Sequence, residues 1–356
     1  MSQRLTRHRR RTTSVLALAA ATTLMAAACG GSSATAPSEQ EATEGAPDFG
    51  DISVQLSWVK TVEFAGEYFA DTKGYFAEEG FDEVTLIPGP AATPSIVASG
   101  QAFAGISDPT RVAPAVANEG APVKIVAAQY QKSPFSIISL ADKANITTPQ
   151  DLVGKRIGIQ TGNEPLFYSL LEANGLDRDS VTIVPVEYDP SSLITGDVDG
   201  FLGYVTNEAV IVESQGYEVA NLLYADNGLP LVAKAVVVSQ DSIDNEREAV
   251  KAFLRAMIRG WHDAIADSEE SARLAVEEYG ADLGLNFDLE LGQAVAANDL
   301  LVSADTDSNG LFTITPELLQ ANIDAIVSAD VDITVDQLFD LSLLDEVYEE
   351  NPELLG

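Results

Sequence analysis

The segment from Gln55 to Phe81, QLSWVKTVEFAGEYFADTKGYFAEEGF, contains a tryptophan and a series of other aromatic side chains, but neither histidine nor cysteine. Aromatic rings can stack on a flat molecule, and polar groups between them can form hydrogen bonds with it. Acid–base catalysis instead most often uses histidine, and covalent catalysis uses an activated nucleophile. The chemistry that this segment favours is therefore binding.

The rest of the chain offers little for catalysis. Beyond the N-terminal region the single histidine is His262, next to Trp261 in the helix-like stretch VKAFLRAMIRGWHDAI, which is typical of a partly buried structural residue. The sequence has no Cys/His cluster for zinc, no HExxH motif, no GxSxG motif and no Walker loop. With 55 acidic residues, a chance pair of carboxylates indicates nothing. We expect no catalytic residue, no metal and no cofactor.

The elements that must position the binding groups alternate between strands and helices. Strands are predicted at 52–56, EVTLI, AFAGIS and VKIVAA, with helices between them, one of which starts with Asp108 as N-cap and Pro109 at its first position. A second series follows, with strands RIGIQT, TIVPVEY, GFLGY and EVANLLY. Two such β-α-β series indicate two parallel sheets with helices on their faces, and the mainly helical remainder must pack on them. We therefore expect two lobes with a cleft between them.

Ligands of open parallel sheets bind beyond the carboxyl ends of the strands. The residues predicted at those ends combine aromatic rings, amides, hydroxyls and carboxylates, which suits a flat polar ligand. They are Ser57, Trp58, Ser107, Asp108, Gln129, Tyr130, Thr161, Asn163, Tyr188, Tyr204, Asn207 and Glu208. Each has a structural alternative: Trp58 could belong to the core, and Glu208 could serve only the dipole of its helix.

The N-terminus predicts export and lipidation. Five arginines precede an apolar run from Val15 to Ala28, which has the length of a signal-peptide core and is too short to span a bilayer. Small residues then lead to Cys29, the only cysteine, which we expect to carry a lipid anchor on the extracytoplasmic face of the cell membrane. Ordinary secretion and twin-arginine export are the alternatives. A small polar tether follows.

The charge balance excludes one class of partner. The chain has 20 basic and 55 acidic residues, and without the five signal-peptide arginines its net charge is about −40. Binding to nucleic acid needs a basic surface, so nucleic acid is excluded as a partner. The acidity is typical of a solubility device.

Several segments together carry a family resemblance: the Gln55–Phe81 segment, VASGQAFAGISDP, DLVGKRIGIQTG, GFLGYVTNEAV and FLRAMIRGW. The chain resembles the solute-binding proteins of ABC importers, in the class that binds thiamine pyrimidine precursors and is related to the hydroxymethylpyrimidine synthases. The resemblance implies an α/β fold of the periplasmic-binding-protein type II, with a ligand cleft between two lobes and two hinge crossings, near Tyr130–Phe135 and Leu229–Lys234. It also implies an ABC permease as partner, and we expect a monomer.

The predicted division of the chain follows from this resemblance. Residues 1–28 form the signal peptide and 29–50 the tether. Residues 51–132 and 232–356 form the first lobe, and residues 133–231 form the second.

Within the family, the Gln55–Phe81 segment separates a binder from an enzyme. The related synthases carry a reactive histidine after the tryptophan of the first strand, where this chain has Phe64, and their cysteine-rich iron motif is absent. We therefore expect a binding protein in which Trp58, Phe64 and Tyr68 offer ring faces and Glu63 an acceptor. A thiamine pyrimidine precursor is the first ligand hypothesis, and riboflavin or a sulfonate- or nitrate-type anion is the alternative. An anion would need donors such as Lys60 or Arg111.

Overall fold

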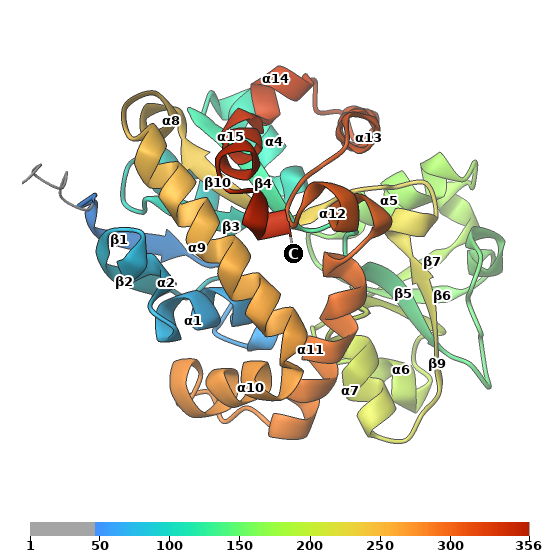
Figure 1. The fold of residues 1–356 in the computed structure, drawn as a ribbon. Coiled ribbons are helices and arrows are strands. Elements are labelled where there is room, and N and C mark those ends of the chain that lie inside the picture. The colour runs from blue at the N-terminus through green and yellow to red at the C-terminus, as the bar shows by residue number, and fades with distance from the viewer. Residues whose placement is uncertain (1–46, 356) are drawn as a thin grey trace, which may run out of the picture. The chain divides into compact units, whose positions relative to one another are not determined.

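The structure, a computed structural model, describes residues 47–355, which contain two five-stranded sheets with helices around them (Figure 1). The α/β class and the two-sheet architecture are confirmed. The predicted signal peptide, Cys29 and nearly all of the predicted tether lie outside the described residues.

The first sheet has the order β2-β1-β3-β10-β4, and we call it, with the helices packed on it, the first lobe. Its strands are β1 (Gly50–Gln55), β2 (Phe81–Ile87), β3 (Ala104–Ser107), β4 (Val123–Tyr130) and β10 (Ala233–Ser239). The helices between them are α1 (Ala65–Thr72), which follows a 3-10 turn at Val62–Phe64, α2 (Tyr75–Glu78), α3 (Thr93–Ala98) and α4 (Pro109–Glu119). β4 and β10, rich in valine, isoleucine and alanine, are buried over almost their whole length.

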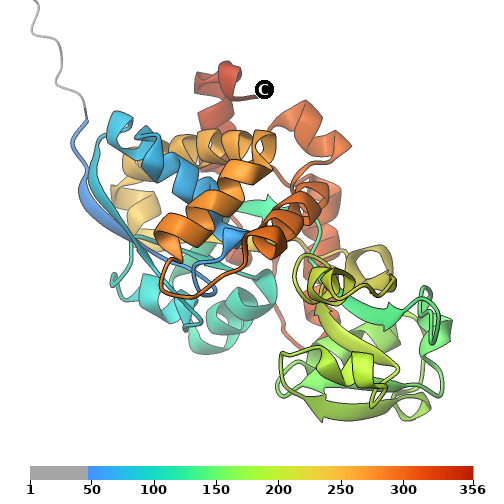
Figure 2. The ribbon, with the colours of Figure 1, turned by 90° about the horizontal axis from the view of Figure 1, so that it is seen from below.

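The second sheet has the order β7-β6-β8-β5-β9 and forms the second lobe with its helices, drawn in green and yellow in Figure 2. Its strands are β5 (Phe135–Leu140), β6 (Arg156–Gln160), β7 (Thr182–Val186), β8 (Gly200–Tyr204) and β9 (Val219–Leu223). Its helices are α5 (Glu164–Ala173), α6 (Ser191–Thr195) and α7 (Glu208–Ser214). The chain passes between the sheets through residues 131–134 and 224–232. The lobe limits given above stay a prediction.

The expectation of two purely parallel sheets is wrong. β10 runs antiparallel to β3 and β4, and β5 runs antiparallel to β8 and β9. Both strands follow a crossing between the lobes, so each enters its sheet from the edge at which the parallel strands end. This reversal places the amino ends of β5 and β10 beside the carboxyl ends of the other strands.

The chain after β10 is mainly helical, as expected. It forms α8 (Gln240–Asn245), α9 (Arg247–Ala266), α10 (Ser268–Arg273), a π-helical turn (Leu274–Tyr279), α11 (Phe287–Leu301), α12 (Ala304–Asn309), α13 (Pro316–Ser328), α14 (Val335–Leu338) and α15 (Ser342–Glu350). In Figure 1 the long α9 runs alongside α1 and α15. Two glycines allow α9 to approach α1: a Cβ on Gly66 would lie 2.2 Å from the Trp261 ring, and one on Gly260 would lie 2.1 Å from the Gly66 carbonyl oxygen.

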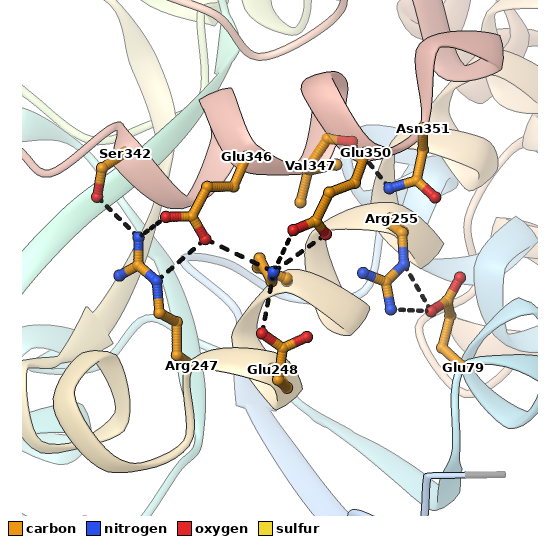
Figure 3. Close-up of polar contacts among 10 residues, drawn as sticks. Glu79, Arg247, Glu248, Arg255, Ser342, Glu346, Val347, Glu350 and Asn351 are labelled. Atoms are coloured by element: carbon orange, nitrogen blue, oxygen red, sulfur yellow. Dashed lines mark hydrogen bonds and ion pairs between the residues drawn. The ribbon is translucent and has the colours of Figure 1, made fainter. Parts of the chain in front are cut away.

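Ion pairs connect α15 with α9 (Figure 3). The Lys251 ammonium is almost fully buried and contacts the carboxylates of Glu248 at 2.9 Å, Glu350 at 2.9 Å and Glu346 at 3.5 Å. Arg247 adds a second pair with Glu346 at 2.5 Å. One buried cation therefore organises three carboxylates at the junction between the two helices.

Candidate functional site

A cavity of about 410 Å³ lies between the two lobes. Its walls come from the carboxyl ends of β3 and β8, the segment after β1, the amino ends of β5 and β10, and helix α11. This is the edge at which open α/β sheets bind ligands. The volume lies within the usual range for small-molecule sites, about 300–1,000 Å³.

Most of the residues predicted from the sequence line this cavity. They are Ser57, Trp58, Glu63, Ser107, Asp108, Tyr130, Asn163, Tyr188, Tyr204, Asn207 and Glu208. They come from both lobes, so a ligand in the cavity would contact the two sheets together.

Four predicted residues do not line the cavity. Thr161 is exposed, and Phe64, Tyr68 and Gln129 are fully buried. Phe64 and Tyr68 belong to the core of the first lobe, where Tyr68 stacks on Tyr279 with ring centroids 4.1 Å apart. For these two rings the aromatic spacing of the segment therefore reflects packing in the core of the first lobe, whereas Trp58 precedes the turn and reaches the cavity.

Gln129 instead forms a buried pair with Glu67. Its amide donates to Glu67 Oε1 over 2.7 Å, whereas Glu67 Oε2 and Gln129 Oε1 have no partner in the described structure. Burial raises the pKa of Glu67, although the nearby Lys234 charge and the Gln129 hydrogen bond oppose this. A proton on Glu67 would remove the charge that burial disfavours and would turn one of its carboxyl oxygens into a hydrogen-bond donor.

Lys234 is the main cavity residue that sequence reasoning missed. Its side chain is buried, and the ammonium lies 3.4 Å from Glu63 Oε1 and donates to the Glu63 carbonyl oxygen. It also lies 3.8 Å from the centroid of the Phe64 ring, with Tyr130 and Trp261 farther away. The residue was missed because it stands at the amino end of β10, whereas the prediction considered only carboxyl ends.

The backbone at Lys234 is held in an unusual conformation. Its φ of 50° lies in the left-handed region, which non-glycine residues seldom occupy. The Lys234 N–H donates to Asp108 Oδ1 over 3.1 Å. Asp108 precedes α4 as predicted, but its side chain makes no capping hydrogen bond and braces β10 instead. Burial raises the pKa of Asp108, against the opposing effect of the Lys234 hydrogen bond.

Glu208 holds the loop after β8. Its Oε2 accepts the Tyr204 N–H over 2.7 Å, and its Oε1 accepts from the Asn207 amide over 3.1 Å. Gly203 makes room for this arrangement, since a Cβ there would lie 2.9 Å from Glu208 Oε2. Burial raises the pKa of Glu208. Its carboxylate therefore positions Tyr204 and Asn207 and has less capacity left for a ligand than the sequence suggested.

Two contacts join the lobes beside the cavity. The Trp58 and Tyr188 rings come from different lobes, with centroids 5.9 Å apart and planes tilted by 52°. Gln293 of α11 donates to Asn207 Oδ1 over 2.9 Å. Both Gln293 and Ala297 line the cavity and were missed, because no pattern in the sequence indicates that a helix of the C-terminal region reaches the second lobe.

The cavity has one further cation, Arg111. It lines the cavity with an exposed side chain, and its guanidinium forms no ion pair or hydrogen bond with other residues in the range 47–355. Lys60, the other donor considered for an anion, does not line the cavity.

Three other features bear on function in the described part of the chain: metal ligands, the histidine His262 and membrane-spanning helices. Within residues 47–355 no group of three or more potential ligands could hold a metal ion. His262 contacts the Leu354 carbonyl oxygen at 3.1 Å, so it joins α9 to the C-terminal turn, and it does not line the cavity. No helix in the same range is both long and apolar enough to cross a membrane. The cavity can stack on a flat molecule and hydrogen-bond its edges.

Comparisons with known proteins agree with this geometry. The profile of the family described as NMT1/THI5 like matches residues 61–271. The riboflavin-binding protein RibY of Chloroflexus aurantiacus is 31% identical over 84% of this chain and 88% of its own length. A formylaminopyrimidine-binding protein of Halalkalibacterium halodurans is 27% identical over 66% of this chain and 70% of its own.

The fold has solved counterparts. The periplasmic aliphatic sulphonate-binding protein SsuA of Escherichia coli superimposes with a TM-score of 0.62 at 14% identity, over 78% of this chain and 85% of that one. This likeness confirms the periplasmic-binding-protein fold.

Proposed function

The chain belongs to the NMT1/THI5-like family, and on this basis we propose that it is the solute-binding lipoprotein of an ABC importer, which captures an uncharged planar N-heterocycle and delivers it to a permease. The observation that carries the proposal is the cavity between the lobes, with aromatic rings from both sides and polar groups between them. Binding proteins of this architecture close around a ligand that both lobes contact.

The size and lining of the cavity favour a fused-ring ligand of the riboflavin class. A volume of about 410 Å³ exceeds what a single substituted pyrimidine fills. Trp58 and Tyr188 offer ring faces, and Arg111 and Asn163 offer donors for the carbonyl edge of a flavin. Asp108 Oδ2, which has no hydrogen-bond partner among residues 47–355, offers an acceptor for the ring N–H. The similarity to RibY over most of both chains supports the same choice.

A thiamine pyrimidine precursor, the first hypothesis from the sequence, becomes the second candidate. Its exocyclic amine suits the Asp108 carboxylate, and the formylaminopyrimidine-binding relative supports it. Glu208, which the hypothesis assigned to that amine, is engaged by its own loop. An anionic ligand has less support, because Lys234 is paired with Glu63 and Lys60 lies elsewhere.

The proposal also covers the location of the protein in the cell and its partners there. Lipidation of Cys29 would hold the protein on the extracytoplasmic face of the membrane, where it meets its permease as a monomer. The relatives named as binding proteins support a role without catalysis.

A thermal-unfolding screen tests the ligand assignment. The purified protein is heated with riboflavin, pyrimidine precursors, alkanesulfonates and nitrate in parallel. A ligand present at about 100 times its dissociation constant stabilises by about 2.7 kcal/mol, and riboflavin is expected to do so. Stabilisation by sulfonate or nitrate alone would overturn the proposal.

A further inference from the structure

The cavity is lined by one buried cation, Lys234, whose ammonium forms an ion pair within the protein. Lys234 lines the cavity, yet its ammonium is directed into the first lobe, where it contacts Glu63 twice, through the carboxylate at 3.4 Å and through the carbonyl oxygen. Glu63 is the only carboxylate among residues 47–355 that forms an ion pair with it. An unpaired buried ammonium would attract an anion strongly, because water screens it little.

The other acidic groups nearby do not replace Glu63. Glu67 is buried behind the cavity, forms no ion pair with Lys234 and bonds to Gln129. Asp108 accepts the backbone N–H of Lys234 and forms no ion pair with the ammonium. Among these carboxylates Glu63 is therefore the one that contacts the Lys234 ammonium directly.

We infer that Glu63 is a specificity-determining residue, which excludes compact anions from the cavity by neutralising the Lys234 ammonium. The inference rests on the proposed function, since it concerns the same cavity, and it names what the cavity rejects. The sulphonate-binding relative shows that this fold can also serve an anion. In this chain one carboxylate would decide between the two ligand classes.

Arg111 also lines the cavity, but it is not expected to attract compact anions as an unpaired Lys234 would. Its side chain is exposed, so water and salt screen its attraction for an anion, whereas the Lys234 site is enclosed. A gain in anion binding through Lys234 can be separated from one through Arg111 by removing the lysine.

The test is calorimetric titration with methanesulfonate and nitrate. Glu63→Gln keeps the shape of the side chain and removes its charge, and it is expected to bind one or both anions at least about tenfold more tightly than wild type. The double variant Glu63→Gln/Lys234→Met is expected to lose that gain. Glu290→Gln is the matched control, because it removes another buried carboxylate beside the same turn, outside the cavity and without a cation partner among the described residues.

Three results would overturn the inference: unchanged anion affinity in Glu63→Gln, a gain that survives in the double variant, or an equal gain in Glu290→Gln. If Glu63→Gln does not fold, Lys234→Met provides the reciprocal test. It leaves the Glu63 carboxylate unpaired and is expected to increase affinity for the cationic heterocycle thiamine, and unchanged affinity would count against Glu63. Titration of wild type with riboflavin tests the proposed function separately.

Discussion

Trp58 and Tyr188 are the residues on which stacking across the cleft depends. Each is partly exposed and belongs to a different lobe, and their rings are tilted against each other at the cavity. A planar ligand that enters between the lobes can lie against either ring. Aromatic contacts of this kind contribute about 0.5–1.5 kcal/mol beyond the burial of area.

Trp58→Ala is therefore expected to weaken binding of the proposed heterocycle about tenfold, because it removes one stacking face and part of the buried area. Calorimetry measures the change. The control is Tyr217→Ala, which removes a comparably exposed ring outside the cavity. Equal affinity in wild type and Trp58→Ala would show that the ligand does not stack on this ring.

The buried carboxyl group of Glu67 is expected to make the free energy of unfolding depend on pH. Burial raises its pKa above the usual value of 4.5. The folded state then holds a proton that the unfolded state has lost, so this stabilising contribution is complete below pH 4.5 and decreases as the pH rises through the folded-state pKa.

Glu67→Gln is expected to remove this dependence, because the amide offers a permanent donor to Gln129 Oε1 and keeps the acceptor for the Gln129 amide. Its free energy of unfolding should vary less with pH above 4.5 than that of wild type, and should equal or exceed it at neutral pH. Denaturant titrations over a pH series measure both. A variant with the same pH slope as wild type would show that Glu67 does not titrate in this range.

At the scale of elements, β5 and β10 explain what the sequence could and could not predict. Apolar patterns located the other strands, whereas β5 and β10 were not among the predicted ones. The carboxyl-end rule placed Trp58, Asp108 and Tyr204 at the cavity. Strand direction is not encoded in such a pattern. The amino ends of the two reversed strands, with Phe135 and Lys234, were therefore missed.

Cavity residues on helices were harder to predict for a similar reason. A helix pattern shows which face is apolar, but not which element that face meets. Phe64 and Tyr68 were assigned to the ligand although they belong to the core of the first lobe, where Tyr68 stacks on Tyr279. Gln293 was not assigned although α11 carries it to the cavity.

The junction of α9 and α15 makes a prediction about stability. Lys251→Met leaves Glu248, Glu346 and Glu350 without their shared cation. Because these carboxylates are partly exposed, we expect a moderate loss of about 1–2 kcal/mol in the free energy of unfolding, larger at low salt. Denaturant titration measures it, and the control is Lys143→Met, at an exposed lysine that forms no ion pair with other residues in the range 47–355. A loss that does not depend on salt would indicate packing in place of charge.

At the scale of the whole molecule, the two crossings and the shared cavity predict closure on the ligand. Trp58 meets Tyr188, and Gln293 meets Asn207, only while the lobes lie together. We expect the radius of gyration, measured by small-angle scattering, to decrease when a saturating ligand is added. An unchanged radius would indicate a rigid protein or a ligand held by one lobe.

The central claim is that the protein binds an uncharged planar N-heterocycle without changing it. The most direct measurement is a calorimetric titration with riboflavin, followed by denaturation and chemical analysis of the recovered ligand. The account predicts saturable one-to-one binding and recovery of intact riboflavin. Recovery of a converted product, or saturable binding of a sulfonate with no binding of riboflavin or of a pyrimidine precursor, would contradict it.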